Sequence, residues 1–147
     1  MSTSAETLGD VASVLGLRET AGGSTLDLVT AVEAGLPVAA VDRLSSSIAP
    51  GDAAFKFLLV PKATLARRRG KKGARLSPEG SARVARVAEV WTRARDVWKD
   101  DEAARAFLFR PHPLLSGRTP IATALGTDLG ARLVGDILGR LEHGTAP

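Results

Sequence analysis

The sequence predicts an all-α fold, and three observations support this prediction. Apolar residues recur at helical spacing, and near the end of the chain they are Leu129, Leu133, Val134, Ile137, Leu138 and Leu141. Helix-start signals precede such runs, for example Thr119 before Pro120 and Thr127 before Asp128. A convincing alternation of apolar and polar residues, as in a half-buried strand, is not seen.

Capping residues, glycines and prolines divide the first part of the chain into short helices. A first helix is expected over about residues 5–15. Ser24 can cap a second helix, which Gly35 ends. Pro37 opens a third helix, which is expected to fade through the serines at 45–47.

The next two helices have the order of a helix-turn-helix motif. Asp52 can cap a helix that contains Phe55, Leu58 and Leu59. The break at Val60-Pro61 separates this helix from a short basic helix, Lys62 to Arg69. A helix, a tight turn and a short basic helix are the parts of a helix-turn-helix.

A long helix is expected from Ser77-Pro78 to about Lys99. Its predicted buried stripe consists of Val84, Val87 or Ala88, Trp91, Ala94 and Trp98. The acids at 100–102 start another helix, and the prolines at 111 and 113 prevent it from continuing.

The composition indicates a globular protein with a core. The chain has 147 residues, of which 44% are hydrophobic and 24% charged, which suits one domain or two small helical lobes. It has no cysteine, which excludes thiolate and disulfide chemistry and fits a reducing compartment. Neither a signal peptide nor a membrane span is evident, so we expect a soluble cytoplasmic protein.

Nearly all the excess positive charge lies in one short segment. Residues 1–60 hold seven acids and three bases, whereas residues 61–75 hold seven bases and no acid. A basic segment of this kind attracts a polyanion by releasing condensed counterions. A solvated loop is the alternative, but the run begins inside a predicted helix, which favours DNA as the partner.

The basic segment contains the predicted DNA contacts. The DNA-binding residues predicted here are Lys62, Thr64, Arg67, Arg68, Arg69, Lys71 and Lys72. The first three are expected to face base edges in the major groove, and the last four to hold phosphates. Because arginine can bind guanine bidentately, Arg67 or Arg68 is expected to give sequence specificity. In the alternative interpretation, these two arginines bind acids of the N-terminal half.

Residue types that serve catalysis and metal binding are scarce. There are two histidines, His112 and His143, and no cysteine or tyrosine. The H-E-x-x-H metal motif and the glycine-rich nucleotide motifs are missing from the sequence. We therefore expect that the chain is not an enzyme and binds no metal or cofactor.

The last third of the chain carries a longer motif: L-x-G-R-T-P, a helix, and then a helix of the form G-x-x-x-V-x-x-x-L-x-R-x-x-x-G. Its letters fall at Leu115, Gly117, Arg118, Thr119, Pro120, Gly130, Val134, Leu138, Arg140 and Gly144. This pattern resembles the toxin-binding domain of the Xre/MbcA/ParS antitoxins. Upstream, VPKATLARRR (residues 60–69) and the L-S-x-E of residues 76–79 resemble the Xre-like helix-turn-helix of the same antitoxins. The chain departs from the family at Phe107-Leu108 and His112, where Trp-Leu and Asn are often found.

The resemblance implies a fold and a function. It implies an Xre-like helix-turn-helix region over residues 1–76, and a connecting helix with a small helical toxin-binding domain over residues 77–147. It further implies a type II antitoxin that occludes the active site of a RES-domain toxin, which consumes NAD, and that represses its own operon. The residues implied to contact the toxin are Leu115, Gly117, Arg118, Thr119, Pro120, Arg140, His143, Gly144, Thr145, Ala146 and Pro147.

Other interpretations stay open. Arg118 would instead bind nearby carbonyls at a helix end, and His143 would complement the negative end of the last helix. A stand-alone helix-turn-helix regulator would use residues 114–144 for dimerisation, and a pure inhibitor would carry a vestigial helix-turn-helix. Because a symmetric operator needs a symmetric protein, we expect a homodimer or a hetero-oligomer with the toxin.

Overall fold

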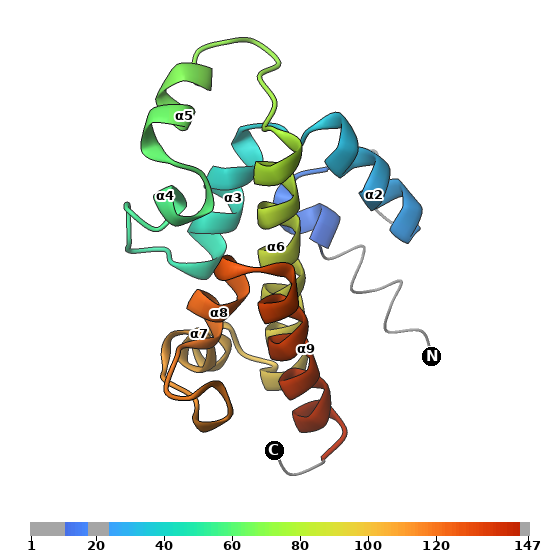
Figure 1. Cartoon of the computed structure of the whole chain (residues 1–147), viewed down its shortest axis with the longest axis vertical. Helices are drawn as coiled ribbons and strands as arrows, with labels where there is room; N and C mark the ends of the chain where they lie inside the picture. Colours follow the sequence, from blue (N-terminus) through green and yellow to red (C-terminus); the bar gives the residue numbers. More distant parts are fainter. Residues whose placement is uncertain (1–10, 18–23, 145–147) are drawn as a thin grey trace. The chain divides into compact units, whose positions relative to one another are not determined.

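A computed structural model of the chain describes residues 11–17 and 24–144. As predicted, the fold is all-α, and within these described residues the one β-type pairing is an isolated antiparallel bridge between Pro37 and Arg75. The elements in order are α2 (Thr25–Ala34), α3 (Ala39–Ile48), α4 (Lys56–Leu59), α5 (Lys62–Arg68), α6 (Pro78–Trp98), α7 (Asp101–Phe109), the 3₁₀ turn η2 (Pro113–Leu115), α8 (Pro120–Gly126) and α9 (Asp128–Glu142) (Figure 1).

The chain forms two compact units, Met1–Ala88 and Glu89–Pro147, here called the N-terminal and C-terminal units. They divide within α6, whereas the sequence placed a domain boundary after residue 76; that domain assignment stays a prediction. Of the predicted first helix, residues 11–15 are helical, and the rest lies outside the described residues.

The start and end of α2 follow the prediction, but α3 is longer than expected. Ser24 and Asp27 form a capping box, in which each side chain accepts a hydrogen bond from the backbone N–H of the other. Gly35 ends the helix with a φ of +95°. The prediction that the third helix fades through its serines is wrong, since α3 continues to Ile48. Burial of its apolar face, and of Ser45 itself, outweighs the weak helix propensity of serine.

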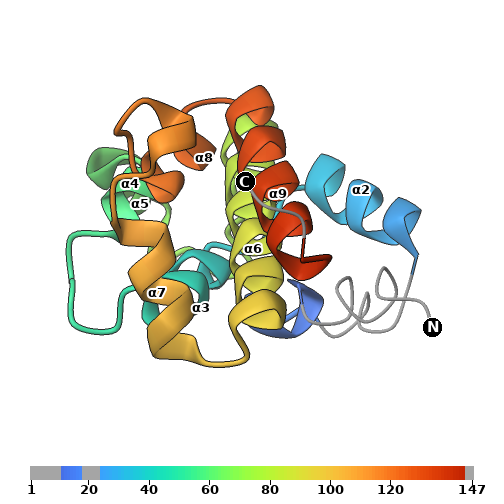
Figure 2. The same cartoon turned by 90° about the horizontal axis from the view of Figure 1, so that it is seen from below.

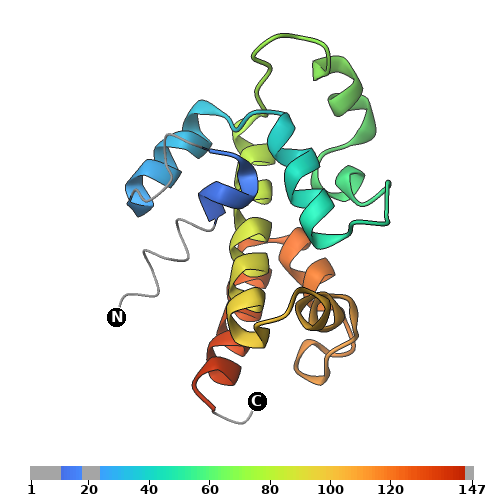
Figure 3. The same ribbon diagram turned by 180° about the vertical axis from the view of Figure 1, so that it is seen from behind.

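The predicted helix-turn-helix segment has a shorter first helix than expected. Asp52 caps a turn, because its Oδ1 accepts a hydrogen bond from the Ala54 N–H at 2.9 Å, and α4 begins only at Lys56. The break at Val60-Pro61 falls where predicted and leads into α5. Helices α3, α4 and α5 lie together in both the front and rear views (Figures 1 and 3).

The segment after α5 is fastened to the segment before α3. The Val38 N–H donates to the Ala74 carbonyl at 3.2 Å, and the Leu76 N–H donates to the Leu36 carbonyl at 2.8 Å. From α6, the buried Ser81 hydroxyl accepts a hydrogen bond from the Leu36 N–H at 2.8 Å. These hydrogen bonds fix the C-terminal end of the basic loop, residues 70–75, to the segment before α3.

In the C-terminal unit the predicted helix starts are confirmed. Asp100, Thr119 and Thr127 each accept a hydrogen bond from a backbone N–H in the first turn of α7, α8 and α9. A short connection joins α8 to α9 (Figure 2). The two helices approach closely at Gly130, where an ideal Cβ would lie 2.2 Å from the Thr123 carbonyl oxygen.

Two apolar features of this unit differ from the expected buried pattern. Trp91 is 1% exposed as predicted, but Trp98 is 40% exposed, so its place in the buried stripe is wrong. Trp98 lies at the end of α6, where its ring packs against Phe107 at a centroid distance of 6.1 Å. No helix of the described residues is long and apolar enough to span a membrane.

Candidate functional site

Helix α5 presents a small, basic face to solvent. Leu65 is buried and anchors the helix, whereas Lys62, Ala63, Ala66 and Arg67 are exposed. The two alanines were not singled out by the sequence pattern, because alanine carries no chemical signal of its own. Because alanine side chains are short, a partner surface can come close to the helix between Lys62 and Arg67.

Three arginines of the basic segment are engaged within the protein. Arg68 Nη1 donates to the Arg75 carbonyl, and Arg69 Nη2 donates to Asp42 Oδ1 at 2.8 Å. Arg75 Nη1 in turn donates to the Gly35 carbonyl at 2.8 Å. The Arg69 and Arg75 contacts tie the basic segment to α3 and to the end of α2, whereas the Arg68 contact closes the segment on itself.

The other predicted DNA-binding residues direct their charge outward. Lys62, Arg67, Lys71 and Lys72 are exposed, and the Lys62 Nζ lies 5.5 Å from the centre of the Phe57 ring. Arg67 Nη2 donates to the Thr64 hydroxyl at 3.4 Å, so these two predicted residues lie together. The acid contact that the alternative interpretation gave to Arg67 and Arg68 is made by Arg69.

In the C-terminal unit, the G-R-T-P motif forms a tight turn before α8. Leu115 is 5% exposed and Pro120 is buried as the first residue of α8, which Thr119 caps. Gly117 has a φ of +84°, a conformation that other residues rarely adopt. Leu115 and Pro120 are thus buried beneath the turn, Thr119 is half-buried, and Gly117 lies at the surface.

The turn exposes Arg118. The His112 N–H donates to the Arg118 carbonyl at 3.0 Å, and His112 Nδ1 accepts a hydrogen bond from the Leu114 N–H at 3.1 Å. These bonds close the turn through the backbone of Arg118 and leave its side chain at the surface. His112, which replaces the Asn often found in the family, thus has a structural role here.

An apolar groove lies beside Arg118, along α8 and α9. Its volume is about 520 Å³. It is lined by Arg118, Ala122, Thr123, Gly126, Thr127, Leu129, Gly130, Arg132, Leu133 and Asp136. Leu129 is 69% exposed and Leu133 is 44% exposed. Helical periodicity placed both leucines on the apolar side of the last helix, but it does not show which of them stay uncovered.

The remaining predicted toxin contacts lie at the end of α9. Arg140 and His143 are exposed and line a shallow depression, and Gly144 follows with a φ of +72°. The structure thus places Arg140 near His143 but at a different pocket from Arg118. Residues 145–147 lie outside the described residues.

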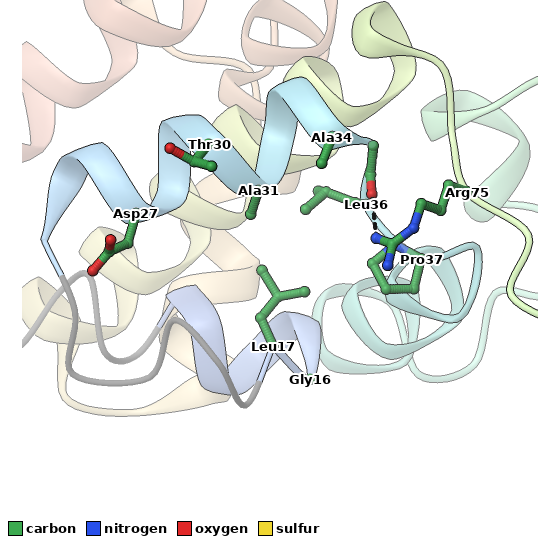
Figure 4. Close-up of a pocket in the computed structure, with 10 residues that line it drawn as sticks. Gly16, Leu17, Asp27, Thr30, Ala31, Ala34, Leu36, Pro37 and Arg75 are labelled. Atoms are coloured by element: carbon green, nitrogen blue, oxygen red, sulfur yellow. Dashed lines mark hydrogen bonds between the residues drawn. The ribbon is translucent and has the colours of Figure 1, made fainter.

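A further pocket of about 560 Å³ lies in the N-terminal unit beside α2 (Figure 4). Its two charged lining residues are both used in the fold, since Asp27 caps α2 and Arg75 binds the Gly35 carbonyl. Among the described residues, no three histidine, cysteine or acidic side chains gather as metal ligands would.

Comparison with known proteins agrees with the motifs of both units. Residues 27–89 match the antitoxin Xre-like helix-turn-helix domain, and residues 93–144 match the antitoxin Xre/MbcA/ParS C-terminal toxin-binding domain. The chain is 36% identical over 120 residues to an antitoxin Xre of Yersinia enterocolitica, covering 80% of this chain and 79% of that protein. It is 33% identical over 113 residues to an antitoxin Xre of Photorhabdus laumondii, covering 75% and 74%. The chain therefore belongs to the Xre family of antitoxins, with a DNA-binding helix-turn-helix domain followed by a toxin-binding domain.

Proposed function

We propose that this antitoxin neutralises a RES-fold, NAD-consuming toxin by covering the entrance of its active site. The RES assignment rests on the resemblance of the terminal motif to that family. The exposed leucine groove on α8 and α9 is the observation that carries the inhibitory role. It lies within the segment that matches the toxin-binding domain.

The groove has the chemistry of a protein interface. Leu129 and Leu133 leave apolar surface in water, and covering it with a partner is favourable. Arg118 and Arg132 lie on the lining of the same groove, with Asp136 as the acid. A partner segment with an apolar side chain flanked by carboxylates fits this combination.

The other proposed toxin contacts belong to the turn that contains Arg118 or to the segment from Arg140 onward. Leu115, Gly117, Thr119 and Pro120 hold the turn that presents Arg118. Arg140, His143 and the terminal residues Gly144, Thr145, Ala146 and Pro147 are proposed to reach the entrance of the toxin's active site. In this proposal the antitoxin blocks access sterically and does no chemistry of its own.

We also propose that the protein represses its own operon through α5. Lys62, Thr64 and Arg67 would face the bases, because they lie on or beside the outward face of α5. Lys71 and Lys72 would hold phosphates. Arg68 and Arg69 would contribute positive charge near the DNA while keeping their internal contacts. A symmetric operator would require two copies of this unit.

Co-expression with the protein encoded by the adjacent reading frame tests the inhibitory role. Leu129→Glu combined with Leu133→Glu places charge in the groove, and we expect about 100-fold weaker binding and loss of protection against NAD depletion. Leu26→Glu is the matched control, since Leu26 is also 69% exposed but lies in α2 of the other unit.

Two results would overturn this proposal. One is undiminished toxin binding by the groove variant. The other is a loss of dimerisation in the groove variant with no toxin bound by the wild type, because the groove would then join two antitoxin copies. In that case the stand-alone regulator becomes the better interpretation.

A further inference from the structure

One carboxylate lies among the cations of the DNA-binding unit. The segment from residue 36 to residue 75, which includes α3, α4 and α5, has nine lysines and arginines but two acids, Asp42 and Asp52. Asp52 accepts a backbone N–H in the turn before α4. Asp42 faces the cations instead, since its Oδ1 lies 2.8 Å from Arg69 Nη2 and 3.7 Å from Lys56 Nζ. Asp42 is therefore the acid that offsets positive charge in this segment.

The Asp42 carboxylate joins three helices. Asp42 lies in the first turn of α3, Lys56 is the first residue of α4, and Arg69 is the C-cap residue of α5. These helices lie together in both the front and rear views (Figures 1 and 3). The side chains are partly exposed, at 49% for Asp42, 25% for Lys56 and 44% for Arg69. A phosphate group at the surface can therefore compete with Asp42 for both cations.

The same cations border the face of α5 that is proposed to read DNA. The Nζ atoms of Lys56 and Lys62 each lie 5.5 Å from the centre of the Phe57 ring, so the ring connects the Asp42 cluster with the start of α5. Arg69 lies at the other end of α5. The charge of Asp42 thus lowers the positive potential that α5 and its flanks present to a polyanion.

We propose that Asp42 is a specificity-determining residue for DNA binding, because it withholds Arg69 and Lys56 from the phosphate backbone. Phosphate contacts give affinity for any sequence, whereas base contacts give the preference for an operator. By reducing the phosphate contacts, Asp42 makes binding depend more strongly on the base contacts of α5. This inference rests on the proposed DNA contacts of α5 and adds a residue that opposes binding to random sequence.

A purely structural role for Asp42 gives the opposite expectation. An acid in the first turn of a helix complements the positive helix end, and the two ion pairs tie α3 to α4 and to the end of α5. Under that role, neutralising Asp42 loosens the motif, lowers the melting temperature and weakens DNA binding. Because exposed ion pairs contribute little to stability, we expect the effect on charge to exceed the effect on the fold.

Asp42→Asn tests the proposal, since it removes the charge while the amide oxygen can still accept a hydrogen bond from Arg69. On a labelled random-sequence duplex at low salt, we expect about tenfold tighter binding, and a slope of log affinity against log salt that is steeper by about 0.9 for each cation released. On a fragment of the protein's own promoter the gain should be smaller, because base contacts already fix α5 there. The ratio of promoter affinity to random-sequence affinity should therefore fall.

Two control variants accompany this test. Glu33→Gln removes an exposed acid of α2 in the same unit, outside the cluster around Asp42, and is expected to leave both affinities unchanged. Asp42→Glu keeps the charge and is expected to keep the wild-type ratio. A gain in affinity for Glu33→Gln equal to that for Asp42→Asn would show that net charge alone matters, and would overturn the role of Asp42.

Arg69→Gln in two backgrounds shows whether Asp42 withholds that arginine. In the wild-type background the substitution should change the salt slope little, because Asp42 already neutralises Arg69. In the Asp42→Asn background it should reduce the slope by about 0.9. Equal effects of Arg69→Gln in the two backgrounds would contradict the proposal.

The outcomes separate this inference from the proposed repressor function. If the wild type binds DNA and Asp42→Asn binds the random-sequence duplex no more tightly, the role of Asp42 is wrong while the DNA-binding function stands. Loss of the helical circular dichroism signal in Asp42→Asn would also overturn it, because the carboxylate would then be needed for the fold. If neither protein binds either duplex, the proposed DNA contacts and this inference both fail.

Discussion

At the scale of single residues, close backbone contacts decide where a side chain is tolerated. Gly130 lies where α8 and α9 meet, and an ideal Cβ there would be 2.2 Å from the Thr123 carbonyl oxygen. Gly126, four residues earlier, has open space around its Cβ position. An alanine substitution at Gly130 therefore tests this close contact, and the same substitution at Gly126 is its control.

We expect Gly130→Ala to lower the free energy of unfolding by about 1–3 kcal/mol, because the helices must separate to admit the methyl group. Gly126→Ala should leave this free energy unchanged or raise it slightly. Urea denaturation followed by circular dichroism measures both. Equal stability of the two variants would show that α8 and α9 do not pack as described.

A second prediction at this scale concerns the buried hydroxyl group of Ser81. Its oxygen accepts the Leu36 N–H at 2.8 Å, so Ser81→Ala leaves a buried donor without a partner. We expect a loss of about 1–3 kcal/mol in unfolding free energy. Ser46→Ala, at an exposed position of α3, should change it far less. A neutral Ser81→Ala variant would contradict the described connection between α6 and the segment before α3.

At the scale of elements, the basic segment divides its cations between structure and solvent. Arg68, Arg69 and Arg75 are bonded within the protein, whereas Lys71 and Lys72 are exposed. The two lysines are therefore better placed to displace counterions from DNA than the tethered arginines are.

Replacing Lys71 and Lys72 together by glutamine is expected to weaken DNA binding and to reduce the slope of log affinity against log salt by about 1.8. Arg69→Gln should reduce it by less, since Asp42 already neutralises that charge. Binding to a promoter fragment across a salt series provides the measurement. An equal or larger change for Arg69→Gln would reverse this assignment.

Several features of the helices could be predicted from the sequence alone. The starts of α2, α7, α8 and α9 were predictable because Ser24, Asp100, Thr119 and Thr127 act on their own first turns. The motif residues around Arg118 could likewise be placed by their spacing. Local signals of this kind need no knowledge of the rest of the fold.

Contacts between residues far apart in the chain could not be predicted from the sequence pattern. Arg69 binds Asp42, which is 27 positions away, so its engagement could not be read from the basic run. Leu129 and Leu133 fit the apolar stripe of α9, but the covering helices leave them exposed. Arg93 of α6 lies against Gly135 and Gly139 of α9, a contact between residues that are far apart in the chain.

At the scale of the whole molecule, the two activities belong to different units. The DNA-binding domain match ends at residue 89, and the toxin-binding domain match begins at residue 93. The proposed contacts of each activity lie within one unit, so substitutions in one unit should leave the other activity intact.

We therefore expect the Lys71 and Lys72 double variant to bind toxin with wild-type affinity, and the Leu129 and Leu133 double variant to bind promoter DNA with wild-type affinity. Fluorescence anisotropy with labelled DNA and calorimetry with the toxin measure the two affinities. A change of more than about fivefold in the untouched activity would establish a coupling free energy between the sites.

The placement of the aromatic residues has a practical consequence. The chain has no tyrosine and two tryptophans, and Trp91 and Trp98 both lie in the C-terminal unit. Intrinsic emission therefore reports on that unit alone, whereas far-ultraviolet circular dichroism reports on all the helices. Trp91 is buried and Trp98 is partly exposed beside Phe107, so their emission maxima should differ. Unlabelled protein thus contains an optical probe of its toxin-binding unit that needs no added dye.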